Sequence, residues 1–110
     1  MSVTFEIVGR RDRSADGAAS LNLSNRNAAD LLRWLGLPAD DLWGDLAAQD
    51  LAARCRRRLW PEARNLDPPI PDEADGRMLA FGRPAGYLRD RTAQLLALCE
   101  AAGEGRIAYG

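Results

Sequence analysis

The chain of 110 residues has 15 basic and 16 acidic side chains, which give a formal net charge of −1, and 46% of its residues are hydrophobic. Its length fits a single domain over residues 1–110, and its composition is typical of globular rather than disordered proteins. The sequence contains no histidine and no lysine, so it lacks the imidazole bases and Schiff-base amines of many enzymes, and its near-neutral charge argues against a general electrostatic hold on nucleic acid.

Two strands are predicted at the start of the chain. Apolar and polar residues alternate over 3–8, which places the apolar side chains on one face of a half-buried strand. The polar stretch 10–17 turns the chain, and residues 19–23 form a second strand. Because adjacent strands with a short link usually pair antiparallel, these two strands predict a hairpin.

A first helix is predicted from Ser24 or Asn25 to about Leu35. Serine and asparagine are good N-cap residues, and Gly36 ends the helix. The apolar residues of this helix share one face: Ala28, Leu31, Leu32 and Leu35. Trp34 projects to the opposite side, so it needs a separate explanation.

A second helix is predicted from near Asp45 to Trp60, because Pro61 follows and disfavours helix before it. Four arginines between residues 54 and 58 spread over the flanks and the outer face of this helix. The proline-rich and acidic stretch 61–76 is typical of a long irregular segment that crosses the surface.

The last third of the chain predicts a strand, a helix and a strand, over residues 77–81, 87–102 and 106–109. A tight loop from Gly82 to Gly86 joins the first two of these elements. Strand, helix, strand implies a right-handed parallel crossover. The complete order ββααβαβ therefore predicts an α+β fold, in which a small mixed four-stranded sheet carries helices mainly on one face.

Trp34 is the first candidate for a functional surface. A tryptophan opposite the apolar face of its helix either lies under another segment, such as the proline-rich stretch, or is exposed with Asp30 beside it as an interface anchor. Arg54, Arg57 and Arg58 either bind an acidic partner or a phosphate backbone, or form a solvated helix face paired with carboxylates. We predict a partner-binding surface made of these five residues.

The loop Gly82–Gly86 is the second candidate. A glycine-rich turn between a strand and a helix can aim backbone N–H groups at an anion, helped by the helix dipole. Arg83, Gly86, Tyr87 and Arg91 would form a phosphate or carboxylate site there, at the carboxyl ends of parallel strands. In the structural alternative, the glycines only shape the turn, and the stem of Arg91 covers apolar surface while its head pairs with a carboxylate.

Catalytic and metal-binding patterns are not found. Cys55 and Cys99 lie far apart without the paired spacing of a zinc site, so we expect buried free thiols and no metal or other cofactor. None of the four serines lies in a nucleophile motif, and no histidine could activate one. Trp43 and Trp60 flank the second helix and are expected to pin its ends against the core.

The location of the protein is also predicted from the sequence. No apolar run approaches the ~20 residues that cross a bilayer. The start, Met1 to Glu6, lacks the basic and apolar regions of a signal peptide. These two features predict a cytoplasmic protein without a membrane partner.

Three stretches carry a resemblance: residues 21–28, the step Gly86-Tyr87-Leu88 and the closing residues 107–110. They resemble short uncharacterised bacterial and phage-associated proteins. The resemblance implies no activity, and it adds an expectation that the protein acts by binding.

Three functions follow in order of preference. The first is a non-catalytic module that contacts another protein, in a phage, prophage or defence context. The second is a sensor or accessory that holds a small anionic ligand at the loop Gly82–Gly86. The third is nucleic-acid binding through the arginines of residues 54–58, and the oligomeric state is left open.

Overall fold

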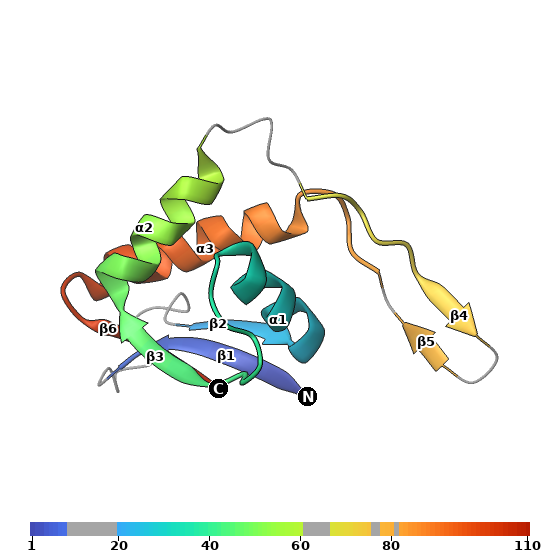
Figure 1. Cartoon of the computed structure of the whole chain (residues 1–110), viewed down its shortest axis with the longest axis horizontal. Coiled ribbons are helices and arrows are strands. Elements are labelled where there is room, and N and C mark those ends of the chain that lie inside the picture. Colours follow the sequence, from blue (N-terminus) through green and yellow to red (C-terminus); the bar gives the residue numbers. More distant parts are fainter. Residues whose placement is uncertain (9–19, 61–66, 76–77, 81) are drawn as a thin grey trace.

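A four-stranded sheet and three helices form two layers, and a separate β-hairpin stands away from them (Figure 1). The computed structural model describes residues 1–8, 20–60, 67–75, 78–80 and 82–110. The elements in chain order are β1 (Ser2–Ile7), β2 (Ser20–Ser24), α1 (Asn25–Trp34), β3 (Gly44–Ala47), α2 (Ala48–Leu59), β4 (Glu73–Asp75), β5 (Met78–Ala80), α3 (Tyr87–Ala102) and β6 (Arg106–Tyr109). The main sheet has the strand order β2-β1-β6-β3, and β4 pairs with β5 in the hairpin.

The predicted hairpin of β1 and β2 is confirmed, with Val3 opposite Leu23 and Phe5 opposite Leu21. All four of these side chains are buried, and each contributes about 1.5–3 kcal/mol to the hydrophobic stabilisation of the sheet. On the other face of the sheet, the side-chain amide of Asn22 donates hydrogen bonds to the hydroxyls of two β1 residues. One face of the sheet is therefore apolar and covered, and the opposite face of this hairpin is polar and exposed.

The three helices cover the apolar face of the sheet (Figure 1). The hydroxyl of Ser24 accepts a hydrogen bond from the Asn27 backbone N–H and caps α1, as the sequence indicates. The chain turns after α1 at Gly36, whose φ of +75° suits glycine. The helices bury Ala28, Leu31, Leu32, Ala48, Leu51, Ala52, Cys55, Leu88, Leu95, Leu98 and Cys99 against the strands. Among the described residues, no helix is long and apolar enough to cross a membrane.

The α+β class, the four-stranded sheet and the placement of the helices on one face are confirmed. The prediction that the sheet is mixed is wrong, because every strand pair in it is antiparallel. The parallel crossover is excluded because β6 already has β1 and β3 as its two neighbours. The fourth strand of the sheet is β3, which runs directly into α2 without a turn residue that would have separated the two elements.

The hairpin between Ile70 and Arg83 projects from the body and is called the arm below (Figure 1). Backbone hydrogen bonds of 2.8 Å in both directions join Ile70 and Arg83 and close its base. Gly82 allows this close approach, since a Cβ atom there would lie 1.8 Å from the carbonyl oxygen of Ile70. The third predicted strand, 77–81, corresponds to β5, and its end residues 77 and 81 lie outside the described residues, as does the predicted turn 10–17.

Candidate functional site

Two arginines of α2 hold the carboxyl-terminal end of α1. Arg54 Nη1 donates hydrogen bonds to the carbonyl oxygens of Leu35 at 3.1 Å and Gly36 at 3.2 Å. Arg58 Nε donates to the carbonyl oxygen of Trp34. The last carbonyls of a helix lack partners within the helix and carry a partial negative charge, so arginine is well suited to them. Much of the arginine run therefore has a structural role at the α1–α2 contact.

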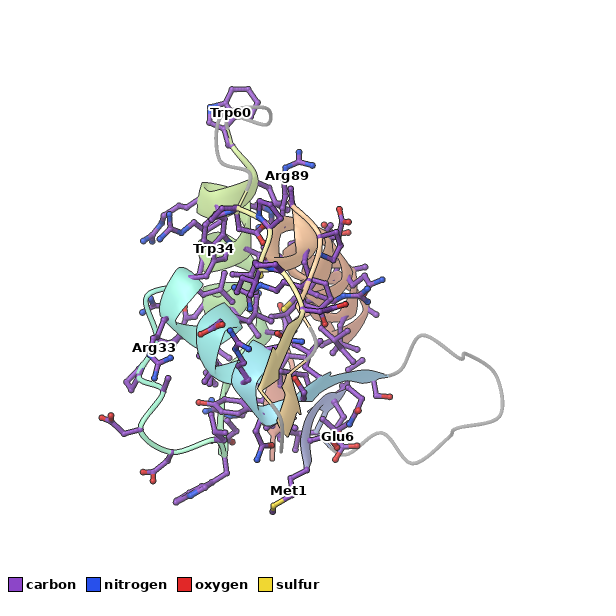
Figure 2. The ribbon with its side chains drawn as sticks, turned by 90° about the vertical axis from the view of Figure 1, so that its right-hand side faces the viewer. Met1, Glu6, Arg33, Trp34, Trp60 and Arg89 are labelled. Atoms are coloured by element: carbon purple, nitrogen blue, oxygen red, sulfur yellow. The ribbon has the colours of Figure 1, made fainter. Side chains whose placement is uncertain are left out.

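Trp34 is partly buried and packs against the core, and Figure 2 shows its position. The guanidinium carbon of Arg58 lies 4.5 Å from the centre of a Trp34 ring, within the range of a cation–π contact. The indole Nε1 of Trp34 is buried and has no hydrogen-bond partner among the described residues. The ring is thus covered in part by Arg58, while one polar atom of Trp34 stays unsatisfied within the described structure.

These side chains surround a surface hollow of about 300 Å³, which we call the arginine hollow. It is lined by Trp34, Leu35, Gly36, Arg54, Arg57 and Arg58. Arg57 is exposed and forms no ion pair with any residue that the structure describes. The hollow therefore combines the exposed guanidinium of Arg57, which has no ion-pair partner within the described ranges, with two guanidinium groups that backbone carbonyls hold in place, next to an aromatic ring.

Asp30 does not line the arginine hollow, although the sequence grouped it with Trp34. One of its carboxylate oxygens lies 2.7 Å from Arg83 Nη1, and the other lies 3.4 Å from Arg33 Nη1. Asp30 thus links α1 to the base of the arm. The structure brings together the other four residues that were predicted to bind a partner: Trp34, Arg54, Arg57 and Arg58.

The residues predicted to bind an anion lie in one chain of contacts. The side chain of Arg83 is only 10% exposed, and its Nη1 donates to Asn27 Oδ1 at 3.1 Å as well as to Asp30. The amide of Asn27 donates to the hydroxyl of Tyr87 at 3.4 Å, and the guanidinium of Arg91 lies 4.9 Å from the Tyr87 ring centre. Arg83 is thus already paired with a carboxylate of its own chain.

A buried carboxylate fills the start of α3, where the sequence led us to expect an external anion. Asp67, which is 3% exposed, accepts hydrogen bonds from the backbone N–H groups of Leu88 at 3.0 Å and Arg89 at 3.1 Å. Its own carbonyl oxygen accepts from the N–H of Gly86 at 2.9 Å. Sequence reasoning missed Asp67. The signal was available, because Gly86 has no side chain to cap α3 and the cap had to come from elsewhere.

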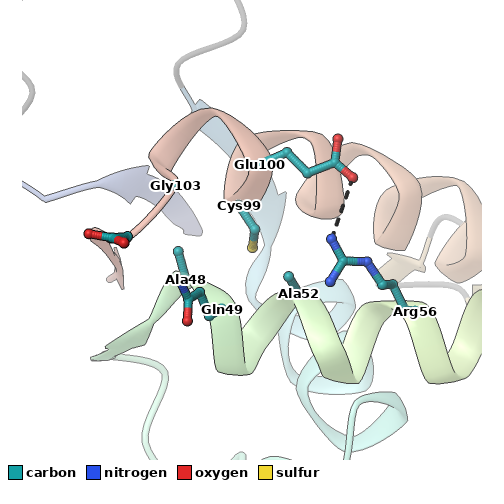
Figure 3. A pocket seen from close by; sticks show the side chains of 8 residues that line it. Ala48, Gln49, Ala52, Arg56, Cys99, Glu100 and Gly103 are labelled. Atoms are coloured by element: carbon teal, nitrogen blue, oxygen red, sulfur yellow. Dashed lines mark ion pairs between the residues drawn. The ribbon is translucent and has the colours of Figure 1, made fainter.

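A second cavity of about 410 Å³ lies between α2 and α3 (Figure 3). Its lining includes Cys99 with the small side chains Ala48 and Ala52, and the ion pair Arg56–Glu100 at 3.8 Å crosses it. Burial raises the pKa of Cys99 to about 11. A thiol with this pKa is protonated near neutral pH, so Cys99 is a poor nucleophile in this cavity.

Both cysteines are free and buried, which confirms that sequence prediction. The expectation for the other two tryptophans is wrong, since Trp43 is 70% exposed and Trp60 is 78% exposed. Trp60 adopts an extended backbone conformation at the end of α2, and Figure 2 shows it projecting away from the body. The position of a tryptophan near a helix end in the sequence therefore did not indicate whether its side chain packs against the core.

The described residues contain no group of three or more histidine, cysteine or acidic side chains that could hold a metal ion. The two regions that the sequence singled out are thus an open hollow at the α1–α2 contact and a network of hydrogen bonds and an ion pair at the start of α3. No family model matches the chain, and neither a curated protein nor a solved structure shows significant similarity to it.

Proposed function

We propose that the protein is a non-catalytic interaction module whose arginine hollow binds an acidic segment of a protein partner. The observation that carries this proposal is the exposed guanidinium of Arg57, which forms no ion pair with any described residue, beside the partly buried Trp34. Arginine and tryptophan dominate the energetics of protein interfaces, and arginine forms strong hydrogen bonds with carboxylates. Arg54 and Arg58 are already ordered by helix carbonyls, so binding would cost less side-chain entropy.

The chemistry of the rest of the chain agrees with a binding role. The sequence has no histidine, and burial raises the pKa of both thiols far above neutral pH. The carboxylates Asp30 and Asp67 are used to hold the structure together, through Arg83 and the first turn of α3. These features support recognition rather than proton transfer or nucleophilic attack.

Charge reversal at Arg57 is expected to abolish partner binding without unfolding the protein. Arg57→Glu breaks no ion pair or side-chain hydrogen bond among the described residues and places a negative charge where the acidic segment would bind. Arg26→Glu is the matched control, because Arg26 is also exposed and lies on α1 in its first turn, away from the hollow. Tagged wild-type and variant proteins are used to capture partners from nuclease-treated lysate of the host, and captured proteins are identified by mass spectrometry.

The expected result is a partner with an acidic segment that wild type and Arg26→Glu capture equally and that Arg57→Glu loses at least about tenfold, because like charges at an interface cost several kcal/mol. Equal capture by Arg57→Glu would overturn the proposal. Capture that Arg57→Glu loses and that is seen only in lysate without nuclease treatment would support the third function instead. Trp34→Ala is a less direct probe, since Trp34 also packs against the core.

A second candidate function is the binding of a small anion near Arg83, Tyr87 and Arg91. One observation favours it: the buried Nε atoms of Arg83, Arg89 and Arg91 have no hydrogen-bond partner among the described residues. Inorganic phosphate, pyrophosphate or a nucleotide should then raise the melting temperature of the wild type, because a ligand that binds the native state stabilises it. The shift should disappear in Arg91→Gln. A melting temperature that none of these anions raises would contradict this candidate.

A further inference from the structure

The arm is fixed to the body of the protein at its base. The backbone pairing of Ile70 with Arg83 and the ion pair of Arg83 with Asp30 tie the base to α1. Beyond the base, β4 and β5 pair only with each other among the described strands, and Figure 1 shows them standing away from the two layers. An isolated two-stranded hairpin has marginal stability in water. An arm of this kind gains stability when a second surface covers it.

The arm and the arginine hollow carry opposite charges. The strand that leads out along the arm has the acidic sequence Asp72-Glu73-Ala74-Asp75. The hollow has Arg54, Arg57 and Arg58, although the whole chain has a net charge of only −1. Opposite charges are therefore separated on one molecule, and the acidic stretch has the chemistry that the proposed function requires of a partner.

We propose that the acidic segment that occupies the arginine hollow is the arm of a second copy of this chain. This inference rests on the function proposed above and names the partner of the same site. Figure 1 shows the arm standing away from its own body, and the arginine hollow of a neighbouring copy offers it the opposite charge. Each copy has one arm and one hollow, so two copies exchange arms around a two-fold axis, which is the commonest symmetry of soluble oligomers.

The first test is sedimentation velocity on the full chain at rising concentration, up to about 0.5 mM, since small polar interfaces are weak. Wild type is expected to change from monomer to dimer, and the dissociation constant is expected to rise several-fold with added salt, because exposed charge pairs are screened. Arg57→Glu in the hollow and Glu73→Arg in the arm should each weaken self-association at least about tenfold. Arg26→Glu should sediment as wild type does.

The decisive sample is the equimolar mixture of Arg57→Glu with Glu73→Arg. In a mixed pair, the unchanged arm of the first variant meets the unchanged hollow of the second, and the two reversed charges also face each other with opposite signs. The mixture should therefore recover the dimer that each variant lacks alone. Recovery cannot be explained by misfolding, since an unfolded variant would not restore assembly.

Failure of this inference is distinguishable from failure of the proposed function. Titration of the Glu73→Arg variant with poly-L-glutamate, with tryptophan fluorescence as the readout, tests the hollow alone. If this probe binds and wild type stays monomeric at every concentration, the inference is wrong and the proposed function stands. If wild type dimerises but Arg57→Glu has no effect, or the mixture does not recover the dimer, the inference is also wrong. If wild type stays monomeric and the probe does not bind, both proposals fail.

Discussion

Replacement of Asp67 by alanine is expected to lower the free energy of unfolding by about 2–3 kcal/mol, because hydrogen bonds to a charged group contribute about 1.5–3 kcal/mol and a lost helix cap costs about 0.5–2 kcal/mol. The substitution leaves the buried N–H group of Leu88 and the partly buried N–H group of Arg89 without their acceptor. It also removes a negative charge from the positive end of the α3 dipole. The measurement is urea unfolding followed by circular dichroism.

Two further variants separate the capping effect from general loss of charge. Asp90→Ala removes an exposed acidic residue from the same first turn of α3, and it should cost less than about 1 kcal/mol, since it loses only the dipole interaction. Asp67→Asn keeps one side-chain oxygen as an acceptor, so its cost should fall between those of the two alanine variants. An Asp67→Ala protein as stable as Asp90→Ala would show that the cap is not formed in solution.

Elements defined by local pattern could be predicted from the sequence. The alternation of β1 and the capping serine of α1 are read within a few residues, and both are present as expected. The buried stripe of α1 follows from helical spacing and was also found. Local periodicity is sufficient here because each of these elements has a single covered face that the pattern marks.

Features that depend on contacts between distant residues could not be predicted. Asp67 caps a helix that begins 20 residues later in the chain, and Arg83 pairs with Asp30 across 53 positions. Nothing in the sequence marked β3 as a strand, because its four residues directly precede α2 and fit the pattern of that helix. The predicted parallel crossover was also wrong. Strand order depends on which edges of β6 are free, and the local sequence does not show this.

The candidate site also combines features that follow from local sequence patterns with features that depend on contacts between distant residues. Helical spacing placed Trp34 opposite the apolar face of α1 and spread the arginines over the flanks and the outer face of α2. The structure brings Trp34 together with Arg54, Arg57 and Arg58 in one hollow. The roles of the arginines differ, however, because Arg54 and Arg58 reach the end of α1 and Arg57 does not. Only the relative position of the two helices decides which of these neighbouring arginines bonds to the end of α1.

The free energy of unfolding is expected to fall steeply at alkaline pH, because two buried thiols release their protons when the chain unfolds. Burial raises the pKa of Cys55 to about 12, and the neighbouring Cys99 adds to the rise. Burial also raises the pKa of Cys99 to about 11, from a usual thiol value of 9.0. Between these values the folded state keeps protons that the unfolded state releases, so the free energy of unfolding falls as pH rises. The stabilisation is complete below pH 9 and is lost as pH rises through the folded-state values.

At about pH 10 the ionisation of each thiol in the unfolded state should lower the free energy of unfolding by about 1.4 kcal/mol. The free energy of unfolding should therefore be about 3 kcal/mol lower than at about pH 8. Urea unfolding over this range, under reducing conditions, measures the slope. The double variant Cys55→Ala, Cys99→Ala should lose most of it and keep a smaller slope from Tyr109, whose pKa burial also raises. An unchanged slope in the double variant would mean that the thiols ionise within the folded state. In that case they would also react with alkylating reagents without unfolding, whereas thiols held neutral in the core should stay unmodified until the chain opens.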